Sequence, residues 1–175
     1  MSKAVIAALV ERFPDAVHAP YEGVGGDDCA FVERSRIVDV CRFLKEDPSL
    51  AFNMSPYITA VDYLGASPRF EVVYNLLSTV HNTRVRLRVK VPEGPEGVVP
   101  SVTGLWRGAD WFERYCWDMY GIPFSGHPDM RRLLMYDEFE GHPLRKDYPL
   151  RGRQPLVVER EVHDIFRGPG PASRD

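Results

Sequence analysis

Residues 84–91 read Arg84-Val85-Arg86-Leu87-Arg88-Val89-Lys90-Val91 and alternate strictly between a cation and an aliphatic side chain. Successive residues of a β-strand point to opposite faces of a sheet, so this period of two predicts a strand with one core face and one cationic face. Two further β-rich runs precede it, at Tyr57–Tyr63 and Phe70–Leu77, with short breaks between them. Together the three runs predict a meander of antiparallel strands.

Three other segments have the spacing of amphipathic helices. Apolar residues recur at helical spacing in Lys3–Phe13, where Pro14 ends the pattern, and again in Ile37–Leu44. The third helix is expected from about Asp110 to Tyr120. Between the first two helices, Ala30–Val32 is expected to end a short strand.

The third helix carries most of the local signals. Asp110 is the expected cap, with Glu113 three residues on completing a capping box. Arg114 and Asp118 are four residues apart and are expected to pair on the helix surface. Gly121 is expected to end the helix in the left-handed conformation.

The predicted fold class is therefore α+β, a mainly antiparallel sheet packed with about three helices and followed by an extended C-terminal strap. The expected divisions are a core domain over residues 1–121, an interface strap over 122–150, and a partly disordered tail over 151–175.

Composition limits the class of protein further. The 175 residues carry a formal net charge of −3, whereas nucleic-acid binding relies on clustered excess Lys and Arg. No run approaches the about 18 apolar residues that a membrane span requires, so any membrane association is expected to come through partners or a surface patch. Cys29, Cys41 and Cys116 are scattered and form no Cys-x-x-Cys motif, so they are expected to be buried thiols rather than ligands of a metal or an iron–sulfur cluster.

The cationic face of residues 84–91 has two interpretations. A solvated outer face is the simpler one, and docking against an acidic partner surface is the functional one. A nucleic-acid adaptor that binds through this face is a rival, and its binding would weaken steeply with salt.

The segment after Gly121 carries the most unusual pattern. Two Gly-His-Pro turns each introduce a dibasic pair, at Arg131-Arg132 and at Arg145-Lys146. A proline after each histidine favours extended backbone, so the zinc helix with two histidines four residues apart is excluded. Three functions remain: a metal or acid–base site, a nucleic-acid contact made by the basic pairs, and an interface strap. Nearby carboxylates cancel the positive field that nucleic-acid binding needs, whereas the arginines favour the interface strap. The residues of the first alternative are His127, Asp129, His142 and Asp147.

Four motifs in this region resemble the signature of the C subunit of the proton-pumping NADH:quinone oxidoreductase, respiratory complex I. They are Ala109–Arg114, Trp117–Ile122, Gly126–Leu134 and Gly141–Pro149, and the resemblance extends over roughly Pro56 to Leu150. The family's usual Glu-Arg-Glu stands here as Glu113-Arg114-Tyr115, which suggests that a charged contact has become an aromatic packing contact.

The resemblance implies a hydrophilic subunit of the peripheral arm, on the cytoplasmic face of a bacterial inner membrane. Its expected partners are the large quinone-site subunit and the small iron–sulfur subunit, with no nucleic acid. The complex transfers electrons from NADH through FMN and iron–sulfur clusters to quinone, coupled to proton translocation, but this chain is expected to hold no cofactor, metal or catalytic residue of its own.

The strap hypothesis places the partner contacts on charged and turn residues, with Leu133, Leu134 and Leu144 as apolar anchors. The predicted interface residues are Glu113, Arg114, Asp118, His127, Pro128, Asp129, Arg131, Arg132, His142, Pro143, Leu144, Arg145, Lys146 and Asp147. Two alternatives stay open: the corresponding subunit of a membrane hydrogenase or other quinone-linked complex, and a stand-alone metal-dependent hydrolase using His127, Asp129 and His142.

Overall fold

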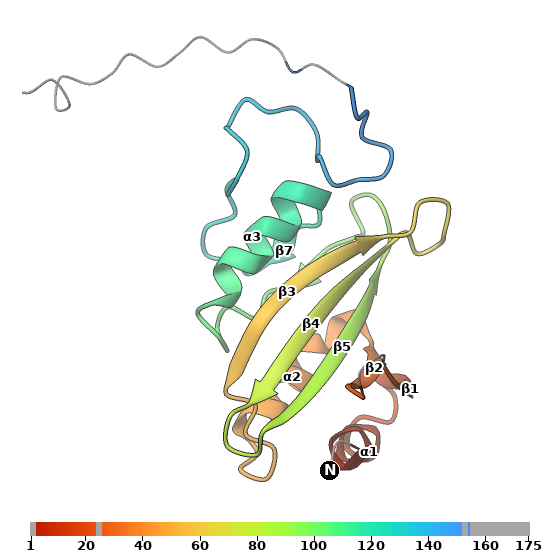
Figure 1. Ribbon diagram of the computed structural model, residues 1–175, viewed down its shortest axis with the longest axis vertical. Coiled ribbons are helices and arrows are strands. Elements are labelled where there is room, and N and C mark those ends of the chain that lie inside the picture. Colours follow the sequence, from red (N-terminus) through yellow and green to blue (C-terminus); the bar gives the residue numbers. More distant parts are fainter. Residues whose placement is uncertain (1–2, 24–25, 152–153, 155–175) are drawn as a thin grey trace, which may run out of the picture.

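The predicted meander forms the larger part of a five-stranded sheet (Figure 1). The computed structural model describes residues 3–23, 26–151 and 154, so the predicted tail lies outside the described residues except for Arg151 and Gln154. In chain order the elements are α1 (Lys3–Arg12), β1 (Val17–Glu22), β2 (Asp28–Val32), a 3-10 turn (Arg34–Arg36), α2 (Ile37–Glu46), β3 (Met54–Asp62), β4 (Phe70–Ser78), β5 (Thr83–Val91), β6 (Val99–Pro100), α3 (Ala109–Tyr120) and β7 (Phe124–Ser125).

The sheet has the strand order β1-β2-β5-β4-β3. Its β3–β4, β4–β5 and β1–β2 pairs are antiparallel, which confirms a mainly antiparallel sheet, whereas β2 and β5 are parallel. The parallel pair joins Asp28 to Val85, residues far apart in the chain, and α2 with the β3–β4 hairpin lies between them in sequence. The α+β prediction is thus confirmed, with one parallel pair added.

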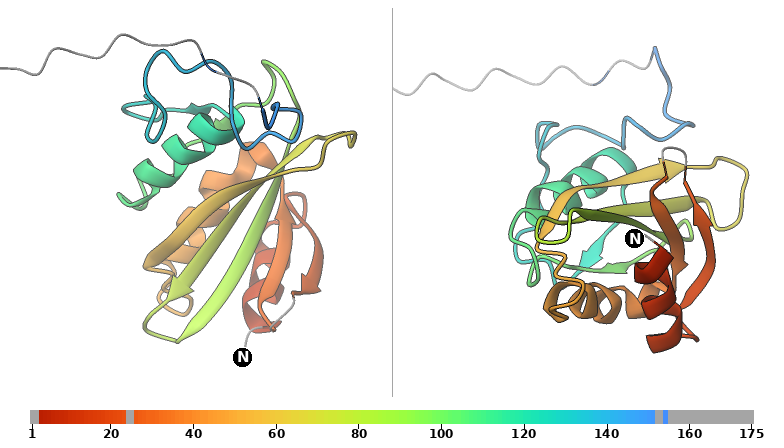
Figure 2. Two further views of the ribbon diagram at one scale, coloured as in Figure 1. Left: turned by 45° about the horizontal axis from the view of Figure 1, so that its top comes forward. Right: turned by 60° about the horizontal axis from the view of Figure 1, so that its bottom comes forward.

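The helices bury one face of the sheet. In Figure 2, α1 and α2 lie along one side of the strands and α3 lies beside the edge strand β3. The core draws on all of these elements, including Leu9 of α1, Val40 of α2, Tyr74 of β4 and Cys116 of α3. All three cysteines are buried and unbridged, as predicted. Within the described ranges, no helix has both the length and the apolar character needed to cross a membrane.

The start of α3 differs from the prediction. Gly108 precedes the helix and makes no side-chain cap, so the capping box of Asp110 and Glu113 is wrong. Glu113 lies on the core-facing side of α3, where its carboxylate accepts hydrogen bonds from the Val102 backbone N–H and the Ser101 hydroxyl, each at 2.7 Å. The predicted helix end is confirmed, since Gly121 follows α3 with a φ of 74°.

A second, two-stranded sheet ties the beginning of the C-terminal segment to the domain. Strands β6 and β7 pair in parallel, Val99 with Phe124 and Pro100 with Ser125. Ile122 and Phe124 are both buried in the core. Two-residue strands carry no periodicity, which is why the sequence pattern does not predict this pairing.

Candidate functional site

The strap, residues 122–150, leaves α3 and runs back along that helix without regular structure beyond β7 (Figure 1). Its dibasic pair contacts Arg114, whose guanidinium donates to the backbone oxygens of Arg131 at 3.1 Å and Arg132 at 2.9 Å. The predicted ion pair of Arg114 with Asp118 is therefore wrong. The strap lies close to both side chains and supplies a different partner to each.

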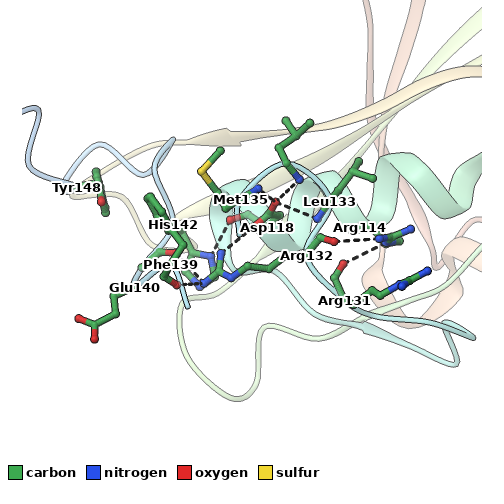
Figure 3. A network of polar contacts seen from close by, with 12 residues as sticks. Arg114, Asp118, Arg131, Arg132, Leu133, Met135, Phe139, Glu140, His142 and Tyr148 are labelled. Atoms are coloured by element: carbon green, nitrogen blue, oxygen red, sulfur yellow. Dashed lines mark hydrogen bonds and ion pairs between the residues drawn. The ribbon is translucent and has the colours of Figure 1, made fainter. Parts of the chain in front are cut away.

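Asp118 is the centre of the anchoring cluster (Figure 3). It is fully buried, and one carboxylate oxygen accepts from three successive backbone N–H groups, those of Leu133 at 3.1 Å, Leu134 at 2.8 Å and Met135 at 3.0 Å. The other oxygen accepts from Arg132 at 2.7 Å. Burial raises the pKa of Asp118, but the backbone donors and Arg132 outweigh it and hold the pKa below its usual range. Asp118 is thus an ionised, fully satisfied carboxylate.

Arg132 closes the loop that follows. Its guanidinium donates to the backbone oxygens of Phe139 at 2.7 Å and Gly141 at 3.3 Å (Figure 3). It also lies over the rings of Trp117, at 5.8 Å, and Phe139, at 5.6 Å. One arginine therefore links α3 to two separate points of the strap.

The last turn of α3 is capped by the strap. Helix C-termini leave backbone oxygens without partners inside the helix. Here the strap contacts three successive backbone oxygens of α3. His142 Nδ1 lies 3.0 Å from that of Asp118, the Leu144 N–H donates to that of Met119 at 3.1 Å, and the Arg145 guanidinium donates to that of Tyr120 at 2.6 Å. Burial lowers the pKa of His142, which favours the neutral ring.

Gly121 makes this close approach possible. A Cβ on Gly121 would lie 2.5 Å from His142 Nε2 and 2.6 Å from Arg145, and the positive φ disfavours any other residue. The glycine thus allows the helix to end and the strap to pass over its end.

The far end of the strap is held at the sheet by Arg69. This buried guanidinium binds both carboxylate oxygens of Asp62 at 2.9 Å, Asp147 of the strap at 2.7 Å and Glu93 at 2.7 Å. The carboxylates raise the pKa of Arg69 further, and the main cause is the hydrogen bonding of its guanidinium to Asp62. The Lys146 N–H also donates to Asp62 at 2.8 Å. Sequence reasoning missed Arg69 and Asp62, because no local pattern links Arg69 to Asp147, 78 positions away, or Asp62 to the Lys146 N–H, 84 positions away.

The residues of the hydrolase alternative are not brought together. His127 contacts the Asp110 backbone oxygen at 3.3 Å, at the beginning of α3, whereas His142 binds at its end. The helix rises about 1.5 Å per residue, so these two contact points are about 12 Å apart. Asp129 pairs with Arg131 at 2.8 Å, and the described ranges hold no cluster of His, Cys, Asp and Glu suited to a metal ion.

The remaining predicted interface residues divide into two groups. Glu113, Arg114 and Asp118 are buried, and Arg132 and Arg145 are bound within the chain. The exposed group is Pro128, Asp129, Arg131, Leu144, Lys146 and Asp147, and Pro143 is half-buried. Tyr115, which stands in place of a family glutamate, packs against the core.

The strap and α3 expose several large apolar side chains among the charged ones. Leu134 is 60% exposed and Trp111 is 61% exposed, and Tyr136 and Leu144 are exposed as well. Large apolar side chains grouped outside a core are typical of protein contact surfaces. The fold and the strap together define the class: an α+β domain that carries a strap with exposed apolar side chains.

Comparison with known proteins identifies the family. Residues 30–154 match the family described as respiratory-chain NADH dehydrogenase, 30 Kd subunit. The chain belongs to this family, and the resemblance seen in its motifs is confirmed.

Similar proteins agree with this assignment. The NADH-quinone oxidoreductase C 2 subunit of Rhizobium etli (strain CIAT 652) is 50% identical over 149 residues, which are 83% of this chain and 76% of that protein. The NADH-quinone oxidoreductase C subunit of Roseiflexus sp. (strain RS-1) is 50% identical over 146 residues, 83% of each chain.

A solved structure has the same fold at lower identity. It is a chain of the membrane-bound sulfane sulfur reductase, described as an archaeal respiratory membrane complex. The match has a TM-score of 0.70 and 22% identity, and it covers 92% of this chain and 98% of that one. At this identity the likeness shows the shared fold.

Proposed function

We propose that the chain is a non-catalytic structural subunit of a respiratory NADH:quinone oxidoreductase, which docks on its partners through the outer side of the strap. One observation carries the proposal. The strap's polar groups hold it to α3, while Leu134, Tyr136 and Leu144 remain outside. This arrangement fixes a contact surface in place and leaves its apolar side chains available to another protein.

Two arginines of the strap have partners other than those predicted. The sequence predicts that Arg132 and Arg145 reach carboxylates or carbonyls of a neighbouring subunit, but in this chain they bind Asp118 and the Tyr120 backbone oxygen. They therefore act as anchors of the strap. The side chains proposed to contact the partner are then the exposed leucines and exposed charged residues such as Arg131 and Lys146.

The proposed partners are the large quinone-site subunit and the small iron–sulfur subunit, on the cytoplasmic face of the membrane. The names of the relatives support an NADH-linked complex over a related hydrogenase. FMN, the iron–sulfur clusters and quinone would then be held by other subunits. The burial of Cys41 and Cys116 supports this division, because desolvation raises the pKa of both thiols and disfavours the thiolate that a cluster needs.

The test replaces two exposed leucines of the strap in the chain as it occurs in membranes. Leu134→Ser with Leu144→Ser removes apolar contacts without adding charge or opening the core. Anchors of this kind each contribute more than about 1 kcal/mol to a protein interface, so we expect at least a tenfold loss of the subunit recovered with the detergent-solubilised complex. NADH-dependent quinone reduction should fall in the same proportion.

The matched control is Val10→Ser, at an exposed valine of α1, a helix that lies at the other end of the domain from the strap (Figure 1). It should leave assembly and turnover unchanged. Normal assembly with reduced turnover in the double variant would assign the strap a role in the chemistry instead. Normal assembly with normal turnover would show that the docking surface lies elsewhere.

A further inference from the structure

The face of the sheet away from the helices is open in Figure 1, where β3, β4 and β5 lie in front of α2. Strand register arranges the side chains of this face in rows. Tyr57, Asn75 and Arg86 form one row, and Val73, Arg88 and Phe31 form the next. These rows lie on the side of the sheet opposite to the strap's anchoring cluster on α3.

The middle of the open face is held rigid by arginines. Arg86 pairs with Asp27 at 3.0 Å and with Asn75 at 2.9 Å. Arg88 pairs with Glu71, donates to the hydroxyls of Tyr21 and Tyr63, and lies over the Phe31 ring at 5.1 Å. Half of the predicted cationic face is therefore neutralised within the chain, and its aromatic rings are fixed in position.

The two ends of the face keep their charge. Arg84 and Lys90 are exposed, and neither forms an ion pair within residues 3–23 and 26–151. Four cations therefore share this face with the carboxylates of Asp27 and Glu71, and Glu33 lines a hollow together with Lys90. The whole chain, in contrast, is acidic, with a formal net charge of −3. This local excess of positive charge favours an acidic partner.

A hollow lies beside Arg84. Its volume is about 340 Å³, and its lining includes Met54, Tyr57, Leu77 and Arg84 as well as the paired Asp27 and Arg86. Met54 is 48% exposed and Tyr57 is 45% exposed. The hollow thus combines a largely apolar lining with a cation at its rim, which suits an apolar side chain next to a carboxylate.

We propose that this open face docks an acidic segment of a partner protein, with an apolar side chain in the hollow and carboxylates on Arg84 and Lys90. The inference rests on the proposed function, since it requires that the chain works inside a complex. Tyrosine and arginine are enriched in protein interfaces, and here both are already ordered. A nucleic acid fits less well, because the chain carries a formal net charge of −3 and, of the four cations of this face, Arg86 and Arg88 are already paired within the chain.

Charge reversal tests the proposal in the assembled complex. Arg84→Glu with Lys90→Glu places like charges opposite an acidic segment, so the subunit recovered with the complex at about 0.3 M salt should fall at least tenfold. The matched control is Arg42→Glu on α2, whose exposed side chain lies on the other side of the sheet. The thermal unfolding of the isolated full chain should be the same for the Arg84→Glu, Lys90→Glu variant and the wild type, since neither cation forms an ion pair within the described residues.

Cross-linking identifies what covers the face. Tyr57→p-benzoylphenylalanine should give, on irradiation of the complex, an adduct on a segment of another protein that contains Asp or Glu, and the charge reversal should abolish it. Three results overturn the proposal: no adduct, an adduct on residues 155–175 of this chain, or an adduct on a segment without carboxylates. Tight binding of a single-stranded RNA probe by the isolated chain would overturn it as well.

The two proposals fail separately. If charge reversal leaves assembly intact while the serine variant of the strap disrupts it, the open face is not a docking surface and the proposed function stands. If the strap variant also leaves assembly intact, the docking role proposed for the strap fails as well, and the chain contacts its partners through another surface.

Discussion

Glu113 gives the sharpest prediction about stability. This carboxyl is fully buried and has no cation in contact within the described residues; its partners are the Ser101 hydroxyl and the Val102 N–H. Burial is the main cause that raises its pKa from 4.5 to about 7, and the two hydrogen bonds offset this only in part. Between pH 4.5 and about 7 the folded protein therefore holds a proton on Glu113 that the unfolded chain releases.

The sign of the effect follows from proton binding. Below pH 4.5 both states are protonated and Glu113 has no effect on the pH dependence. Between pH 4.5 and about 7 only the unfolded chain ionises, so the free energy of unfolding falls as pH rises. A difference of about 2.5 units corresponds to about 3 kcal/mol, and this loss is complete above pH 7.

Glu113→Gln removes the titration and keeps the shape of the side chain. The free energy of unfolding of the variant, measured in urea and compared with the wild type, should improve by about 3 kcal/mol between about pH 4.5 and 8. Glu46→Gln, at an exposed position on α2, is the matched control and should show no such trend. Parallel curves for Glu113→Gln and the wild type would refute the reasoning, because they would mean that Glu113 ionises at the same pH in both states.

Two further predictions concern the anchors of the strap. Asp118→Asn places an amide donor against the strap's N–H groups or Arg132, at a cost of about 2–3 kcal/mol. Hydrogen exchange at the backbone amides of residues 133–135 should therefore accelerate roughly 30- to 150-fold. The exposed control Asp129→Asn should leave these exchange rates unchanged. Arg69→Ala leaves the buried carboxylate of Asp62 unpaired, and the free energy of unfolding in urea should fall by about 3–5 kcal/mol. A loss below about 1 kcal/mol would contradict this, and adding Asp62→Asn should recover most of the stability.

The parts of the fold that sequence reasoning predicts rest on local patterns. Strict alternation over residues 84–91 locates β5, and helical spacing with Gly121 at its end locates α3. The parallel pairing of β2 with β5 could not be predicted, since it depends on how α2 and the hairpin return the chain.

The site is predicted in part. The strap residues stand out correctly as unusual, but the sequence pattern assigns their partners to another protein. Asp118 and Arg132 are 14 residues apart and meet only because the strap folds back on α3. An available signal was the pair of acidic residues, Glu113 and Asp118, on the helix sides that pack inward, because buried carboxylates require donors from elsewhere.

The anchoring of the strap bears on the entropy of association. Fixing an irregular segment costs about 1–2 kcal/mol per residue in lost backbone freedom. Because Asp118 and Arg132 already order residues 133–141 in the chain by itself, most of that loss occurs when the chain folds, before any partner arrives. The chain therefore meets its partners as a preorganised surface, so its association should resemble the contact of two rigid bodies more than coupled folding and binding.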